Sequence, residues 1–212
     1  MAMPYFDEEA VRSRLRWDDL IDAMESALAA FSRGEVVQPV RTVLTIEERR
    51  RYLGIMPAVL GEVMGMKLVS FYPVNAGSPF PTHNATIVIY DTETGQPLAA
   101  MDGRLITEMR TAAVSAAITR YLAPSDTRVL ALLGSGVQAH SHLQALSRVA
   151  KFSEVRVWSR NSEHAERFAR EHGAGAADSA EAAVRGADVI VTATASREPI
   201  LRGAWLKPGA HV

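Results

Sequence analysis

Residues 130–140 read LALLGSGVQAH, and this stretch decides the fold of the second half of the chain. An apolar run stops at Gly134, and the residues from Val137 onward have the pattern of a first helical turn. Residues 134–139 match the spacing G-x-G-x-x-G/A. In that pattern the first glycine permits a sharp turn, Gly136 leaves room for a diphosphate, and Ala139 lets the helix pack closely on the strand. The spacing favours a nucleotide-binding loop over a plain tight turn.

The segments around this loop alternate between strands and helices. We expect strands over 127–134, 154–160, 174–177 and 187–195, and helices over 137–150, 162–172 and 179–185. Such alternation predicts βαβ units, a parallel sheet and an α/β, Rossmann-type domain over residues 125–212. Residues 206–212 resemble the start of a further strand. Since a doubly wound fold normally has about six strands, we interpret the domain as incomplete and the chain as C-terminally truncated.

Residues 1–124 predict a separate α+β domain. Apolar residues at three- and four-residue spacing indicate a helix over 7–33. Short runs rich in β-branched and aromatic residues predict strands over 40–46, 51–60, 64–73 and 84–103, the last divided into a hairpin at DTETG, where Gly95 can take a positive φ. An alanine-rich helix follows over 105–123, with Thr107 as its candidate cap.

The composition excludes several classes of protein. The 212 residues carry a net charge of −1, 48% hydrophobic residues and no cysteine. We therefore expect no nucleic-acid partner, no disulfide and no cysteine-based metal site, and we predict no metal site of any kind. The charged N-terminus lacks the apolar core of a signal peptide, and no window approaches about 18 consecutive apolar residues. These features favour a cytoplasmic protein without a membrane partner.

The end of the second strand of the α/β domain indicates which nucleotide binds. An acidic residue at this point would hold the ribose 2′-hydroxyl of NAD. The sequence has Ser159, Arg160 and Asn161 there, and a guanidinium is well matched to a 2′-phosphate. NADP(H) is therefore predicted over NAD(H), although Glu163 nearby leaves a solvated arginine open. The candidate cofactor residues of the α/β domain are Gly134, Ser135, Gly136, Val137, Gln138, Ser159, Arg160, Asn161, Thr192 and Thr194.

Three cations of the predicted α+β region are candidates for binding a substrate. Lys67 lies inside an apolar strand, Arg110 lies on the alanine-rich helix, and Arg41 precedes a strand. Buried cations need partners, so these residues could hold a carboxylate ligand. The competing interpretation is that these three cations are ordinary solvated side chains whose stems pack on the surface.

Particular segments carry a resemblance to a known family. They are VVQPVRTV, KLVSFY, PTHNAT, AAMDGRLITEMRTAAVSA, LLGSGVQAHSH and GADVIVTATASREPIL. With them the chain resembles the ornithine cyclodeaminase/mu-crystallin family, most closely its mu-crystallin branch. The resemblance implies a homodimer formed through the N-terminal domain. It also implies that Arg41 and Arg110 hold the substrate carboxylate, that Lys67 shares their pocket, and that Thr82 and His83 lie near the nicotinamide.

The same resemblance implies an NADPH-dependent ketimine reductase that reduces the C=N bond of cyclic α-imino acids. Two other activities remain open within the family: NAD-dependent ornithine cyclodeamination, which yields proline and ammonia, and alanine dehydrogenation. A third alternative is a non-catalytic protein that binds a thyroid-hormone-like carboxylate. The aspartate that the cyclodeaminases use would follow residue 212.

Overall fold

The computed structural model describes residues 3–212, which form two compact units. The first unit contains residues 3–16 and Ser26–Thr107, and the second contains Trp17–Glu25 and Glu108–Val212. The division falls early in the alanine-rich helix rather than after it. Domain limits of 1–124 and 125–212 therefore stay a prediction, and residues 1–2 of the first range lie outside the described residues.

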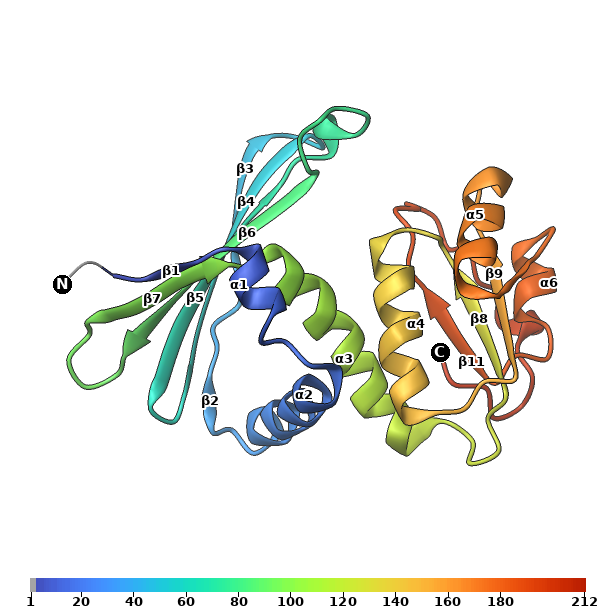
Figure 1. The fold of residues 1–212 in the computed structure, drawn as a ribbon, viewed down its shortest axis with the longest axis horizontal. Helices are drawn as coiled ribbons and strands as arrows, with labels where there is room; N and C mark the ends of the chain where they lie inside the picture. Colours follow the sequence, from blue (N-terminus) through green and yellow to red (C-terminus); the bar gives the residue numbers. More distant parts are fainter. Residues whose placement is uncertain (1–2) are drawn as a thin grey trace. The chain divides into compact units, whose positions relative to one another are not determined.

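The first unit is built on a seven-stranded sheet (Figure 1). Its strands follow the order β1-β7-β6-β5-β4-β2, with β3 also paired to β4; all pairs are antiparallel except β1 with β7. The strands are β1 (Tyr5–Phe6), β2 (Val36–Val37), β3 (Thr42–Glu47), β4 (Arg51–Leu60), β5 (Val63–Phe71), β6 (His83–Asp91) and β7 (Pro97–Asp102), with a 3-10 turn η1 (Pro73–Asn75). The predicted hairpin is confirmed, with Gly95 at φ 70°.

The single helix predicted over 7–33 is wrong in one respect, because the structure divides it into α1 (Glu8–Arg12) and α2 (Trp17–Ser32). The hydroxyl of Ser13 donates to the carbonyl of Ala10 at 2.8 Å, a local bond that competes with helix continuation. Arg16 is extended, at φ −115° and ψ 138°. Two aspartates then occupy the first turn of α2, where the helix dipole favours negative charge.

Helix α3 (Arg104–Leu122) matches the predicted alanine-rich helix, but Thr107 does not cap it. Thr107 lies inside the first turn, where its amide donates to the carbonyl of Gly103 at 2.9 Å. The carboxylate of Asp102 instead accepts the amide of Arg104 at 2.8 Å, which satisfies the first free donor of the helix. Four alanines of α3 are at most 1% exposed: Ala112, Ala113, Ala116 and Ala117.

The second unit contains the parallel sheet that the sequence predicts, in the order β10-β9-β8-β11 (Figure 1). Its elements are β8 (Val129–Leu133), α4 (Val137–Val149), β9 (Glu154–Trp158), α5 (Ser162–His172), β10 (Gly175–Ala176), α6 (Ala180–Val184), β11 (Val189–Thr192) and the 3-10 turn η2 (Gly203–Trp205). His211 bridges Val189 in parallel, at the position expected for a further strand. The α/β, Rossmann-type class is therefore confirmed.

The run LALL forms β8 because both faces of this strand are buried. Successive side chains of a strand point to opposite faces. Leu130 and Leu132 accordingly pack in one core cluster with residues of α4 and α5, including Leu146 and Phe168. The neighbouring side chains of β8 pack in a second cluster with residues of α6 and β11. Within residues 3–212, no helix combines the length and the apolar character needed to cross a bilayer.

Candidate cofactor site

The glycine-rich loop lies where the ends of three parallel strands meet. Gly134 has φ +121°, and its amide donates to the carbonyl of Trp158 at 2.8 Å. A Cβ at Gly134 would lie 2.2 Å from the carbonyl oxygen of Ala193. Because L residues rarely adopt this φ and no Cβ fits there, this position requires glycine.

The second glycine serves a different purpose. Gly136 is the N-cap of α4, with φ −89°, and a Cβ on it would meet no atom within 4 Å. The space beside Gly136 is thus open, and the first amides of α4 point outward because they lack partners within the helix. Ala139 is fully buried, so α4 packs closely on the sheet. An open space at a helix N-terminus, with its positive dipole end, suits a diphosphate.

A cavity of about 580 Å³ extends from this loop across the ends of β9 and β11. The predicted residues that line it are Gly134, Ser135, Gly136, Ser159, Arg160, Asn161 and Thr194. Val137 and Gln138 do not line it, and a binding role for their backbone amides stays a prediction. Gln138 Oε1 is the one buried side-chain polar atom without a hydrogen-bond partner among the described residues. Thr192 lies in a separate cavity of about 290 Å³, with Ser115, His142 and His211.

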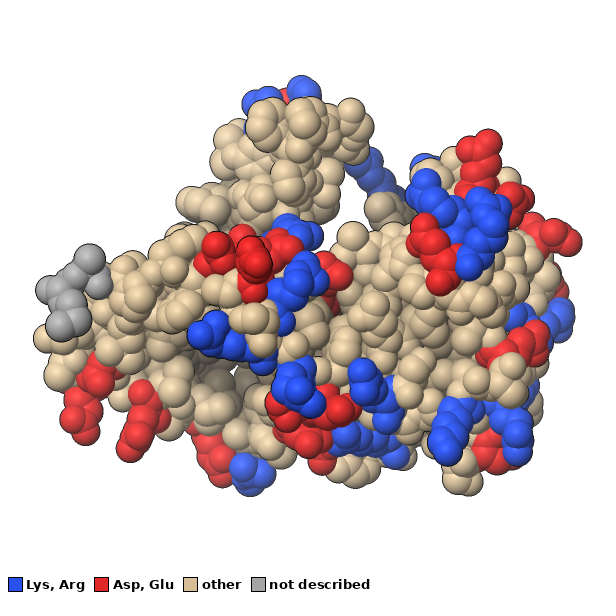
Figure 2. Space-filling model, in the orientation of Figure 1, with Lys and Arg blue, Asp and Glu red and all other residues tan. Residues whose placement is uncertain are grey.

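The charge of the first cavity favours an anion. Within the part of the chain that the structure describes, its lining contains no aspartate or glutamate, whereas Arg160 and Arg167 contribute guanidinium groups and His164 an imidazole. His164 and Arg167 were not predicted from the sequence. Elsewhere basic and acidic side chains are interspersed on the face seen in Figure 2, as the net charge of −1 suggests. The cavity is therefore a local concentration of positive charge rather than part of a basic surface.

The predicted substrate residues are distributed over both units. In the first unit, Lys67 is half-buried in the middle of β5, and its Nζ donates to the hydroxyl of Thr107 at 3.5 Å. Arg41 is exposed just before β3, and His83 begins β6. Arg110 is half-buried in α3, in the second unit. The contact of Lys67 with Thr107 was not predicted, and a common carboxylate site for these cations stays a prediction.

Thr82 and His83 lie together at one end of the sheet of the first unit. The carbonyl of Thr82 accepts the amide of Tyr72 at 2.7 Å, and His83 is paired with Phe71 in the ladder between β5 and β6. Both side chains are half-buried. Their place near a nicotinamide stays a prediction.

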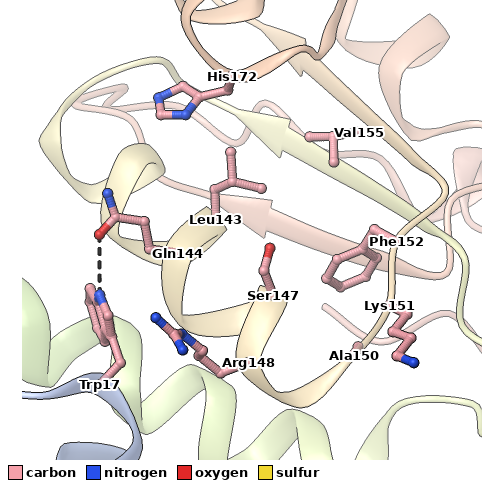
Figure 3. Close-up of a pocket in the computed structure, with 10 residues that line it drawn as sticks. All are labelled: Trp17, Leu143, Gln144, Ser147, Arg148, Ala150, Lys151, Phe152, Val155 and His172. Atoms are coloured by element: carbon pink, nitrogen blue, oxygen red, sulfur yellow. Dashed lines mark hydrogen bonds between the residues drawn. The ribbon is translucent and has the colours of Figure 1, made fainter.

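A further cavity, of about 610 Å³, lies along α4 (Figure 3). Leu143, Gln144 and Arg148 of α4 line it together with Phe152, and the indole nitrogen of Trp17 donates to Gln144 Oε1 at 3.1 Å. Neither the glycine-rich loop nor the carboxyl end of a strand borders this cavity. Ligands of open α/β sheets bind at those carboxyl ends, so the cavity at the loop is the better candidate for the cofactor.

Known proteins are similar in sequence to nearly the whole of this chain. Ketimine reductase mu-crystallin of Rattus norvegicus is 43% identical over 219 residues, covering 100% of this chain and 70% of the relative. An alanine dehydrogenase of Archaeoglobus fulgidus is 34% identical, covering 97% of this chain and 64% of the relative. The chain thus spans about two thirds of the length of these relatives.

Two solved structures superpose closely on this chain. Thermococcus litoralis Δ1-pyrroline-2-carboxylate reductase in complex with NADH and L-proline has a TM-score of 0.92 at 31% identity, covering 99% of this chain and 67% of that one. An archaeal alanine dehydrogenase dimer with bound NAD also has a TM-score of 0.92, at 33% identity, covering 100% and 66%. Because the family model for ornithine cyclodeaminase/mu-crystallin matches residues 5–212, the chain belongs to the ornithine cyclodeaminase/mu-crystallin family.

Proposed function

We propose that the chain is part of an NADPH-dependent reductase of the C=N bond of cyclic α-imino acids. The observation that carries this proposal is the open, acid-free cavity at the glycine-rich loop, in a chain 43% identical to a ketimine reductase. The named relatives include reductases and dehydrogenases of amino and imino acids. A cytoplasmic location stays a prediction.

The residues of the cavity fit a nicotinamide dinucleotide. The space beside Gly136 and the first amides of α4 would receive the diphosphate, and Arg160 would pair with a 2′-phosphate. Arg167 adds a second guanidinium to the same lining, which would strengthen the preference for the more negative cofactor. When bound, this cofactor supplies a hydride, and the protein supplies binding, orientation and electrostatics.

We further propose that Arg41 and Arg110 bind the substrate carboxylate and that Lys67 governs the proton on the imine nitrogen. Guanidinium forks hold a carboxylate in a fixed orientation, and fixed orientation lowers a reaction barrier by several kcal/mol. An ammonium group held beside a hydroxyl, as Lys67 Nζ is beside Thr107, can donate to an imine nitrogen. Thr82 and His83, which belong to the first unit like Arg41 and Lys67, would complete the site.

The test of the activity compares three reactions of the purified protein. We expect the oxidation of NADPH by a cyclic ketimine to be faster than the conversion of ornithine with NAD. The rate of NADPH oxidation by the cyclic ketimine should also exceed the rate of alanine oxidation with NAD. The solved relatives that contain NADH or NAD favour an NAD-dependent dehydrogenase or cyclodeaminase as the second candidate. Faster turnover in either NAD-dependent reaction would replace our proposal with that one.

The first prediction concerns the choice of cofactor. Arg160→Ala removes the guanidinium proposed to bind the 2′-phosphate, and charge-assisted bonds of this kind are worth about 1.5–3 kcal/mol. We expect the ratio of the Kd values for NADPH and NADH to change by at least about tenfold. Nucleotide fluorescence measures both constants, and Arg170→Ala, an exposed change on α5, is the matched control. An unchanged ratio in Arg160→Ala would remove the argument for NADP(H).

The second prediction concerns the substrate carboxylate. Arg41→Lys and Arg110→Lys keep the charge but lose the planar fork. We expect each to raise the KM for a cyclic ketimine about tenfold, while the Kd for NADPH stays unchanged. Arg50→Lys, on the exposed Arg50 that pairs with Glu47, serves as the control. Unaltered KM values would show that these arginines are merely solvated.

We also propose that the protein is a homodimer that associates through the first unit. The solved archaeal alanine dehydrogenase is a dimer, and strand β3 carries half-exposed apolar side chains at Val43, Leu44 and Ile46. Light scattering after size-exclusion chromatography would give the mass directly. A monomer at micromolar concentration would contradict this proposal.

A further inference from the structure

Helices α4 and α5 bring two histidines and a glutamate together away from the cavity at the glycine-rich loop. His140 lies in the first turn of α4, and His172 is the last residue of α5. The Nδ1 atom of His140 lies 2.6 Å from Nε2 of His172. With a carboxylate oxygen of Glu171, these ligand atoms all lie within 4.8 Å of one another. The group was not predicted from the sequence, and none of its members has a part in the proposed reaction.

The two rings are held in place by a buried side chain. Phe168 is 1% exposed, and its ring centroid lies 4.5 Å from that of His140 and 4.5 Å from that of His172. Both rings are themselves half-buried. Rings fixed by packing need little reordering to bind an ion, which favours affinity. Glu171 is exposed, so its carboxylate can rotate toward the rings without disturbing the core.

The chemistry of the three groups selects the class of ion. Neutral imidazole is the usual nitrogen ligand of transition metals, and it predominates above a pH of about 6.5. Two imidazoles with one carboxylate suit borderline ions such as Zn²⁺, whereas Mg²⁺ and Ca²⁺ prefer oxygen ligands alone. With Zn–N bonds of about 2.0–2.1 Å, tetrahedral geometry separates two nitrogens by about 3.3 Å. To bind the ion, Nδ1 of His140 and Nε2 of His172 would therefore need to move apart by less than about 1 Å from their present distance of 2.6 Å.

We propose that His140, Glu171 and His172 form a binding site for a divalent transition-metal ion of the Zn²⁺ class, which joins α4 to α5. His172 also lines the cavity along α4, so the ion can enter from that side (Figure 3). Three protein ligands leave the fourth position for water, as in known three-ligand zinc sites. The proposal replaces the prediction of no metal site, and it does not depend on the proposed function.

The test uses the whole chain, free of any polyhistidine tag and stripped with a chelator. Titration with ZnCl₂ against a chromophoric chelator at pH 7.5 is expected to show one equivalent bound. The thermal midpoint should rise by several degrees when free Zn²⁺ is about 100 times its Kd, because the ion binds only the folded state. Replacing Zn²⁺ with Co²⁺ should give the visible absorption of a bound imidazole–carboxylate complex.

Variants decide between an ion site and a simple hydrogen bond between two imidazoles. His172→Gln and Glu171→Gln should each weaken Zn²⁺ binding at least about tenfold. Since Glu171 is exposed, its variant should fold normally, as circular dichroism would show. His164→Gln, another exposed histidine on α5, is the matched control and should bind Zn²⁺ as the parent does. No bound equivalent, or equal affinity in all variants, would overturn the proposal and leave only a histidine pair.

Discussion

Replacing Gly134 with alanine is expected to destabilise the second unit by more than about 3 kcal/mol and to abolish nucleotide binding. The new Cβ would lie 2.2 Å from the carbonyl oxygen of Ala193. This oxygen belongs to a backbone held in place by the bond from the amide of Ala193 to the carbonyl of Leu133, at 2.8 Å. The φ of +121° adds its own strain for any residue with a side chain. Urea unfolding followed by tryptophan fluorescence measures the loss.

The matched substitution is Gly136→Ala, in the same loop. A Cβ there meets no atom within 4 Å, and φ −89° suits alanine. We therefore expect a stability within about 0.5 kcal/mol of the parent. The Kd for NADPH should rise at least about tenfold, because the methyl group would fill the space proposed for the diphosphate. Equal losses of stability in the two variants, or normal binding by Gly136→Ala, would contradict the roles assigned to these glycines.

The elements around these glycines could be predicted from the sequence, whereas some helix ends could not. The run before Gly134 and the G-x-G-x-x-A spacing predict β8, the turn and α4 from local patterns alone. The break between α1 and α2 was missed because the apolar periodicity runs on through it. At the end of α1 the hydroxyl of Ser13 bonds the carbonyl of Ala10 and Arg16 is extended, and no periodicity reports such local features. Thr107 was taken as a cap because it precedes the alanines, whereas Asp102 accepts the first amide of α3.

The candidate sites, too, could be predicted only where a local sequence pattern indicates them. The loop and residues 159–161 follow from the order of strand and helix, since ligands lie at the carboxyl ends of parallel strands. His164 and Arg167 could have been found as well, because they lie three residues apart on one face of α5, the helix that begins just after Arg160. The contact between His140 and His172 could not, because it joins residues 32 positions apart and depends on how two helices pack. Sequence patterns identify chemistry within one element and miss chemistry that packing assembles.

A second large loss of stability is expected on replacing Asp188, a residue immediately before β11 that is 7% exposed. Its carboxylate accepts the amides of Arg128 and Val129 at 2.8 and 2.7 Å and pairs with the ammonium of Lys207. Both amides bond the same oxygen, Oδ2, so Asp188→Asn can keep an oxygen toward them only by turning its NH₂ group toward the ammonium of Lys207. We expect a loss of about 1.5–3 kcal/mol, the range for hydrogen bonds to a charged group, because the side chain of Lys207 is 38% exposed and the ion pair is only partly buried. Urea unfolding at pH 7 measures this loss, and Asp126→Asn, on an exposed loop, is the control.

The dependence of this effect on pH separates the charge of Asp188 from its packing. Burial works to raise the pKa of Asp188, but the bonds from Lys207 and the two amides outweigh it and hold the pKa below its usual value. A carboxyl with a depressed pKa stabilises the fold above its unfolded pKa of about 3.9. That contribution is lost as the pH falls through the folded pKa. The difference in unfolding free energy between the parent and Asp188→Asn should therefore be constant from pH 7 to about pH 5 and should shrink below about pH 4. A difference that persists unchanged at acid pH would mean that the shape of the side chain, rather than its charge, holds β11 against β8.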